Sequence, residues 1–182
     1  AGVLVDEAHN LVERARGMYS AELDQQRLNR LRRVAPSPIA GPLGRLARQW
    51  QTVIKAAGLE AAGDKGPPGY ALLATLPDKL VGAVQQVGAA ITDYLGEHPD
   101  QASLELQELL FEALAFCRLA EHFGEHSLCD LTRHGRGRAV LGLRNLIPAD
   151  FLAARFNAAH SVVLFSATLN PAHYYRDLLG LS

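Results

Sequence analysis

The stretch AGVLVDEAHN at residues 1–10 decides how this chain is organised, because an apolar run ends abruptly in charged side chains. Residues 1–5 are short, apolar and contain two valines, which predicts a buried β-strand. Two carboxylates, Asp6 and Glu7, follow directly at its carboxyl end. In open α/β sheets this end of a strand is where ligands bind, so residues 6–9 are candidates for a functional site.

A second run of the same kind lies far along the chain, at residues 161–165 (SVVLF), and Ser166-Ala167-Thr168 follow it. Neither run alternates apolar and polar residues, which is typical of central strands in a parallel sheet covered on both faces. Both strands therefore deliver polar side chains at the end where open sheets bind ligands.

The residues between these two strands are predicted to be mostly helical. The spacing of apolar residues and the positions of proline predict four long helices. They span about residues 10–33, 42–59, 70–97 and 100–126. Pro77 either kinks the third helix or opens its main part. The fourth is apolar nearly all round, so we expect it to be the core helix.

A β-hairpin is predicted where residues 127–132 and 138–146 flank a basic, glycine-containing turn, and a short helix at 148–157 follows. The predicted fold is mainly α, a helical insertion flanked by two short strands of an α/β domain. We divide the chain into residues 1–10, 11–146 and 147–182. An ordinary crossover between parallel strands needs only about a dozen residues, so the insertion is the bulk of the molecule.

Composition narrows the class of protein. Of 182 residues, 48% are hydrophobic and 20% are charged, which indicates a packed globular chain. The net charge of -1 gives no global attraction to nucleic acid or lipid, and no apolar run is long enough to span a membrane. Only two cysteines occur, which favours a reduced, intracellular compartment. The chain begins without methionine, and we expect it to be a piece of a longer protein.

The paired carboxylates point to phosphate chemistry. An apolar strand that ends in two acids is suited to hold Mg²⁺ and a water beside a nucleotide phosphate. Asp6 suits the metal, Glu7 can polarise an attacking water, and His9 would lie beside the phosphate. The alternative is that Asp6 and Glu7 only cap the helix that follows.

Two motifs resemble those of a known family. The stretch VLVDEAHN (residues 3–10) resembles the Walker B motif, motif II, of superfamily 2 helicases, and its final asparagine is typical of the XPD/DinG iron-sulfur group. The stretch SVVLFSATLNP (residues 161–171) resembles motif III of the same group, and YYRDLLGL (174–181) also resembles its counterpart there. Ser-Ala-Thr at 166–168 departs from the Ser-Gly-Thr of eukaryotic XPD-like members and is closer to bacterial DinG-like ones.

The resemblance implies a 5′ to 3′ helicase that uses ATP and Mg²⁺ to translocate on single-stranded DNA in repair or replication, in the bacterial cytoplasm near the nucleoid. It implies that Asp6 holds Mg²⁺ and that Glu7 is the catalytic base. It also implies that His9 couples the nucleotide to DNA, and that Ser166 and Thr168 link hydrolysis to unwinding. The helical insertion would be the family's arch domain.

Several parts of such a motor are missing from these 182 residues. There is no Gly-x-x-x-x-Gly-Lys-Ser/Thr loop, whose backbone N–H groups and lysine cradle the ATP phosphates. In the family, the four cysteines that bind the 4Fe-4S cluster precede motif II. The resemblance is therefore compatible with such a cluster in the full-length protein, but not within these 182 residues. We therefore expect the 182-residue chain alone neither to hydrolyse ATP nor to unwind DNA.

The insertion has two candidate roles. Residues 11–50 hold eight arginines against three acids, and a second basic group lies in the hairpin. The arginines could track a DNA backbone or could simply form a solvated, ion-paired helix face. The DNA-binding candidates are Arg27, Arg30, Arg33, Arg45, Arg48, Arg136 and Arg138. Alternatively, the insertion docks a repair or replication protein and makes little direct DNA contact.

Overall fold

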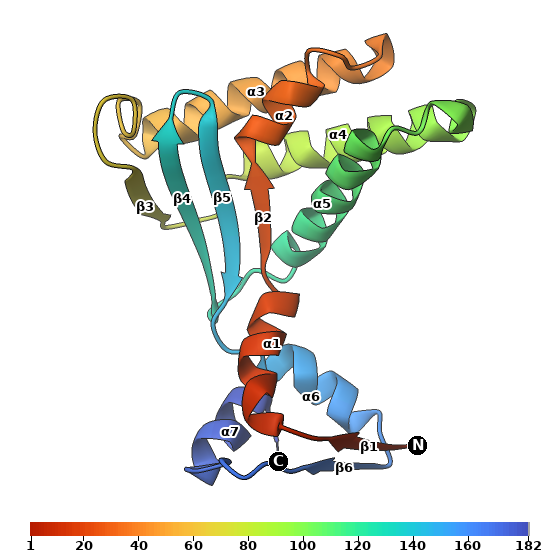
Figure 1. Ribbon diagram of the computed structural model, residues 1–182, viewed down its shortest axis with the longest axis vertical. Helices are drawn as coiled ribbons and strands as arrows, with labels where there is room; N and C mark the ends of the chain where they lie inside the picture. The colour runs from red at the N-terminus through yellow and green to blue at the C-terminus, as the bar shows by residue number, and fades with distance from the viewer. Residues whose placement is uncertain (182) are drawn as a thin grey trace. The chain divides into compact units, whose positions relative to one another are not determined.

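The computed structural model describes residues 1–181 (Figure 1). These residues contain seven α-helices and six β-strands, so the fold is a mixture of α and β structure. The strands form two sheets, one of two strands and one of four. The chain divides into two compact units. Unit 1 comprises residues 1–20, 124–127 and 144 onward, and unit 2 comprises residues 21–123 and 128–143.

Unit 1 contains the two predicted end strands, β1 (Gly2–Val5) and β6 (Ser161–Leu164), as parallel neighbours. Its helices are the 3-10 helix η1 (Ala8–Asn10), α1 (Leu11–Met18), α6 (Ala149–Asn157) and α7 (Ala172–Leu179). The expectation that both faces of this pair are covered is wrong, because Leu4 is 75% exposed and Val163 is 49% exposed. Leu4 and Val163 are register partners, so the side of the sheet that they share is exposed to solvent.

The hydrophobic core of unit 1 is small. Four side chains from three helices are buried in it: Val12, Ala15, Leu152 and Leu179. The ring of Tyr19 stacks on that of Phe151, with ring centroids 4.2 Å apart. The core therefore joins the beginning of the chain to its last forty residues or so through apolar and aromatic contacts.

Hydrogen bonds to backbone groups tie together the three stretches of chain that make up unit 1. Asn145 N donates to Ser20 Oγ at 3.0 Å, and Leu146 N donates to the His126 carbonyl at 2.9 Å. Arg16 Nε donates to the Leu146 carbonyl at 2.8 Å. These backbone N–H and C=O groups lie close in sequence to the points where the chain leaves one unit for the other, and each of them has a hydrogen-bond partner.

Unit 2 is built around a four-stranded antiparallel sheet with the order β2-β5-β4-β3. The strands are β2 (Ala21–Asp24), β3 (Gly69–Leu73), β4 (Ser127–Gly135) and β5 (Arg138–Asn145). The predicted hairpin is confirmed as β4 and β5. Strands β2 and β3, which flank the hairpin on its two sides, lie in stretches that were predicted to be helical.

Helices α2 (Gln25–Leu31), α3 (Ser37–Ala56), α4 (Asp78–Glu97) and α5 (Leu104–Ala120) complete unit 2, with the 3-10 helix η2 (Pro99–Gln101) between the last two. Apolar residues recur every three or four positions on α3 and are buried there: Leu43, Leu46, Trp50, Val53 and Ile54. They pack with buried residues of α4, α5 and the inner face of the sheet in one continuous core.

The single helix predicted over residues 10–33 is wrong, because α1 ends at Met18 and β2 separates it from α2. Asp24 has an extended backbone, and its Oδ1 accepts a hydrogen bond from Gln26 N at 2.7 Å, which caps α2. Leu23 is buried and lies opposite Leu141 of β5. Tertiary pairing supplies the hydrogen bonds of β2, so the local apolar spacing did not reveal this strand.

The third predicted helix starts later than expected. Residues 69–73 form β3, and α4 begins at Asp78, so Pro77 opens the helix rather than kinking it. Proline is tolerated at the start of a helix because the first backbone N–H groups have no helical partner there.

The fourth helix does contribute four buried side chains to the core, Leu106, Leu109, Ala113 and Phe116, but it is not buried all round. Helix α5 ends at Ala120 rather than His126, and it buries one face while leaving large apolar residues on the other. Leu104, Phe111 and Leu114 are 68%, 67% and 52% exposed. Among residues 1–181, no helix combines the length and apolar composition that crossing a membrane would need.

Candidate functional site

The two turns that follow β1 and β6 meet in unit 1. The parallel register places Val5 beside Leu164, so the residues after each strand emerge at the same edge. The backbone continues the pairing, because Phe165 N donates to the Val5 carbonyl at 3.1 Å and Ala8 N donates to the Phe165 carbonyl at 3.2 Å. Residues 6–9 and 166–168, which are far apart in the sequence, are therefore neighbours in space.

Side chains from the two turns form one polar cluster. His9 Nδ1 lies 2.8 Å from Ser166 Oγ and 3.2 Å from Glu7 Oε2. Ser166 Oγ donates to Glu7 Oε2 at 3.5 Å and lies 3.4 Å from Thr168 Oγ1. With its proton on Nδ1, the His9 ring donates to Ser166, and the Ser166 hydroxyl donates to Glu7. Hydrogen bonds thus link Glu7 and His9 of the first turn to Ser166 of the second.

Glu7 has an unusual backbone for a residue with a side chain. Its φ of 50° lies in the left-handed region, which costs about 1 to 3 kcal/mol for a residue other than glycine. Its backbone N–H donates to Asp6 Oδ1 at 2.7 Å. Such strain persists where the surrounding structure fixes it, and it is frequent at functional sites.

The capping alternative does not describe this turn. Glu7 occupies the cap position of η1 and Asn10 that of α1, and neither side chain makes a capping hydrogen bond. The Asp6 carboxylate accepts from the backbone of the next residue, which lies outside the helix. Both acids are exposed, so their remaining oxygen lone pairs face solvent.

The donor set of the cluster fits Mg²⁺. This ion binds proteins through one or two carboxylates and keeps its other positions for water and substrate phosphates. Asp6 and Glu7 offer oxygens of this kind at the end of β1. Within residues 1–181, no group of three or more His, Cys, Asp or Glu side chains forms a complete metal cage.

The two cysteines do not fit an iron-sulfur cluster, which takes four thiolates. Cys117 lies on α5 and Cys129 on β4. Burial raises the pKa of the Cys117 thiol to about 11 and that of the Cys129 thiol to about 12. Both thiols therefore stay neutral near pH 7 and belong to the apolar packing of unit 2.

The sequence matches no protein-family model and no curated protein.

The predicted DNA-binding arginines all lie in unit 2, and one of them is already engaged. Arg27 Nη1 is 2.5 Å from Glu112 Oε1 and 3.3 Å from Glu108 Oε2, so it joins α2 to α5. Burial raises the pKa of the Glu112 carboxyl, and the nearby Arg27 only partly offsets this. Arg27 is thus better described as a structural ion-pair partner than as a phosphate ligand.

The other arginines of α2 and α3 lie on the surface. Arg30 and Arg33 are exposed at the end of α2, and Arg48 is exposed on α3. None of these three forms an ion pair within residues 1–181. Arg45 is exposed as well, and its Nε donates to Gln86 Oε1 on α4 at 2.9 Å.

A hydrogen bond joins the two basic groups of the sequence. Asn29 Nδ2 on α2 donates to the Gly137 carbonyl in the turn between β4 and β5 at 3.2 Å. Arg30 and Arg136, each one residue away in the chain, therefore border the same region. Arg138 is exposed there and donates to the His134 carbonyl at 3.0 Å. Their positions in the sequence, about a hundred residues apart, did not predict this proximity.

Sequence reasoning did not single out the structural role of Arg133. This side chain is only 6% exposed and lies 3.2 Å from both carboxylate oxygens of Asp64. It also donates to the Ala62 carbonyl. Arg133 holds the loop between α3 and β3 against the hairpin. The sequence predicted Arg133 in the basic turn of the hairpin, where a side chain is exposed, whereas the structure places it inside β4 and buries it.

Proposed function

We propose that this chain carries motifs II and III of the first motor domain of an XPD/DinG-type DNA helicase, with unit 2 as its arch. The observation that supports this most directly is the 2.8 Å contact between His9 and Ser166, which joins the two resembling motifs across a parallel strand pair. A fortuitous Asp-Glu-Ala-His would not be expected to meet a Ser-Ala-Thr turn 157 positions away.

Asp6 and Glu7 would have different roles in ATP hydrolysis. Bound Mg²⁺ would neutralise the charge that develops on the transferred phosphoryl group. Asp6 would hold the ion, and Glu7 would accept a proton from the attacking water. Because Glu7 Oε2 also faces His9 and Ser166, a shift of this carboxylate toward the nucleotide would break contacts with both. That is a direct route from hydrolysis to the turn that carries Thr168.

Single-stranded DNA is the proposed partner of the basic region. Exposed arginines suit phosphate oxygens because the guanidinium group donates in a bidentate manner. The region where Arg30 of α2 borders Arg136 and Arg138 of the hairpin is the strongest candidate. Such binding would weaken steeply with added salt, since it releases counterions from the DNA.

The test is ATP hydrolysis by the full-length parent, with and without single-stranded DNA. We expect DNA to stimulate turnover, and Glu7→Gln to lower it about 100-fold or more, because a general base contributes at least that much. Ser166→Ala should keep more hydrolysis than Glu7→Gln but lose unwinding. Asp150→Asn, at an exposed carboxylate on α6 outside the resembling motifs, is the control. Turnover that is indifferent to Glu7→Gln would contradict the proposal.

A second arm uses the 182-residue chain itself. Without a phosphate-binding loop, we expect no Mg²⁺-dependent ATP hydrolysis above a protein-free blank. Measurable turnover that disappears with Glu7→Gln would show that these residues form a complete catalytic site, and the division of labour proposed here would be wrong.

The alternative, a protein-docking role for unit 2, is favoured by the exposed apolar residues of α5. Charge reversal separates the two roles. Arg30→Glu with Arg33→Glu in the full-length parent should abolish DNA-stimulated turnover if the arginines track DNA. Intact turnover together with the loss of a bound protein would favour docking.

A further inference from the structure

Strand β3 lies at an edge of the four-stranded sheet and carries two large exposed side chains. Within residues 1–181, the strand order β2-β5-β4-β3 gives β3 a partner strand on one side only. Tyr70 is 59% exposed and Leu72 is 60% exposed. They lie two residues apart on a strand, so both are on the same face of the sheet. An exposed aromatic ring on a sheet is a platform on which an unpaired base can stack.

The register brings Tyr70 close to the basic end of the hairpin. Tyr70 pairs with Thr132, so His134, two residues further along β4, is its diagonal neighbour on the same face, at about 7 to 8 Å. The His134 carbonyl accepts the hydrogen bond from Arg138. Arg136 lies in the turn between β4 and β5, and both arginines are exposed. Tyr70 is therefore near the two hairpin arginines that are candidates for contact with the DNA backbone.

A groove of about 690 Å³ lies between β3 and the C-terminal half of α3. Its volume is in the range of pockets that bind small ligands. Most of the residues that line it are apolar, and Gln49 and Thr52 of α3 add an amide and a hydroxyl group. Leu72 lines this groove and shares the sheet face of Tyr70. The groove therefore offers an apolar surface with hydrogen-bonding groups, which suits a nucleobase, directly beyond Tyr70.

The charge of this part of unit 2 favours a polyanion. Residues 37–79, from the start of α3 to the first turn of α4, contain five lysines and arginines against three acids. One of these acids, Asp64, is paired with Arg133. The twelve residues before this range add four arginines and no acid, and the thirteen after it are uncharged. The positive balance therefore does not depend on where the range ends.

Two cations lie on the side of α3 that borders the groove. Arg48 and Lys55 are exposed, four residues before and three residues after Thr52, so all three share one side of the helix. Neither Arg48 nor Lys55 forms an ion pair within residues 1–181. Cations are therefore available toward both ends of β3, with the hairpin arginines at one end and these two at the other.

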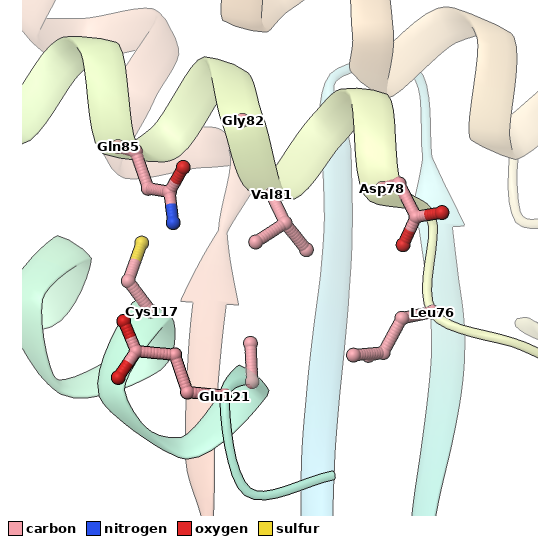
Figure 2. Close-up of a pocket in the computed structure, with 8 residues that line it drawn as sticks. Leu76, Asp78, Val81, Gly82, Gln85, Cys117 and Glu121 are labelled. Carbon is pink, nitrogen blue, oxygen red and sulfur yellow. The ribbon is translucent and has the colours of Figure 1, made fainter.

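The cavity between α4 and α5 has a different lining. It has a volume of about 240 Å³, and Figure 2 shows Val81 pointing into it from α4 and Leu76 from the segment that leads into α4. Among the residues of the described chain that line it, Asp78 and Glu121 are acids, and none is lysine or arginine. This cavity offers no cation to a phosphate group, so it does not suit a DNA backbone.

We propose that Tyr70 stacks on an unpaired base of single-stranded DNA whose backbone contacts Arg136 and Arg138, and that the strand continues along β3 toward the groove beside α3. The inference rests on the proposed function, because it takes single-stranded DNA as the partner of unit 2. Stacking uses the face of the base, which every base possesses, so the contact is tolerant of sequence. In a duplex the bases stack on one another, and Tyr70 finds no free face.

The experiment combines DNA binding and photocrosslinking with the 182-residue chain. An oligothymidylate of about 20 nucleotides, longer than one single-strand site, carries fluorescein and reports affinity by anisotropy. A second oligonucleotide carries 5-iodouracil in place of thymine, which forms a covalent link to a stacked aromatic side chain under long-wavelength ultraviolet light. We expect mass spectrometry to locate this link at Tyr70.

Variants of the chain test the role of the ring. Tyr70→Ala should weaken single-strand binding at least about fivefold and abolish the link, because base stacking on an aromatic side chain contributes at least that much. Tyr70→Phe keeps the ring and should keep both the affinity and the link. A duplex of the same length should bind wild type and Tyr70→Ala equally.

Phe111→Ala is the matched control. It removes another exposed aromatic side chain of unit 2, from α5, which packs against β2 at the opposite edge of the sheet. It should leave the affinity and the link unchanged.

Arg136→Gln with Arg138→Gln separates this inference from the proposed function. This variant should weaken binding to single strands and to duplex alike and lower the salt dependence. If it does so while Tyr70→Ala keeps the wild-type affinity, the arginines bind DNA but Tyr70 does not stack on a base. A link formed at another residue would also overturn the stacking.

Two further outcomes concern the partner itself. If neither the chain nor the full-length parent binds single-stranded DNA at low salt, DNA is not the partner, and the inference fails together with that part of the proposed function. A dimer of the chain that Tyr70→Ala dissociates, seen by sedimentation without DNA, would mean that a second copy covers β3 instead.

Discussion

Gly63 is a residue whose identity is dictated by its surroundings. It lies in the loop between α3 and β3 with a φ of +75°, and a Cβ placed there would lie 2.4 Å from the His134 carbonyl carbon. The neighbouring atoms belong to the backbone of the hairpin and cannot move aside cheaply. Gly63→Ala should therefore destabilise the chain by at least about 2 kcal/mol, measured by urea unfolding.

Gly66, in the same loop, is the matched control. It has an ordinary φ, and no atom lies within 4 Å of the Cβ that an alanine would add. Gly66→Ala should change the free energy of unfolding by no more than about 0.5 kcal/mol. Equal effects at both positions would mean that the loop is not held against the hairpin as described.

At the scale of single residues, the sequence predicted which side chains of unit 1 belong to the candidate site, but it did not predict the contacts among them. Glu7, His9 and Ser166 were singled out by their positions after two apolar strands, and parallel pairing of these strands brings them into contact. The pairing of Arg27 with Glu112 was beyond reach, because it depends on how α2 packs on α5. Local sequence says nothing about such a non-local contact.

Helices α2 and α5 are held together by a contact that should respond to pH. Burial raises the pKa of the Glu112 carboxyl above its ordinary value of 4.5, so the folded state favours the protonated form. The stabilisation from this group is complete below pH 4.5 and is lost as the pH rises through the raised pKa, because the folded state binds the extra proton.

Glu112→Gln removes this titration. The difference in free energy of unfolding between wild type and Glu112→Gln should shift against the wild type as the pH rises from about 4 to 7. Urea titrations at several pH values measure it. Glu105→Gln, at an exposed glutamate near the start of the same helix, is the control. A difference that does not change with pH would mean that Glu112 titrates normally.

At the scale of elements, long amphipathic helices were predictable and short strands were not. Helices α3 and α4 each carry apolar residues at helical spacing over twenty residues, so their existence could be predicted from periodicity alone. Strand β2 has four residues, and β3 has five, and both depend on pairing with the hairpin. The apolar composition of α5 predicted a helix buried on all sides. Composition alone does not show whether other elements of the chain pack against every side of the helix.

For the whole molecule, the two units differ in how much core each possesses. All 24 buried side chains of the larger core lie between residues 23 and 143. Unit 1 buries only four side chains in its core and has a sheet of two strands, which is marginal in water by itself. We expect the amides of β1 and β6 to exchange with solvent much faster than those of β4 and β5, as hydrogen exchange would measure.

The same distribution predicts that residues 21–143 fold without the rest of the chain, because they retain the whole of the larger core and all but the last residues of β5. The sole tryptophan, Trp50, is 1% exposed in that core, so its fluorescence reports on unit 2 in both chains. The emission of residues 21–143 should be as blue-shifted as that of the complete chain, with a similar urea midpoint. Trp50→Phe should abolish the signal in both chains. Emission typical of a solvated indole in residues 21–143 would show that unit 2 needs unit 1 to fold, which would contradict this prediction.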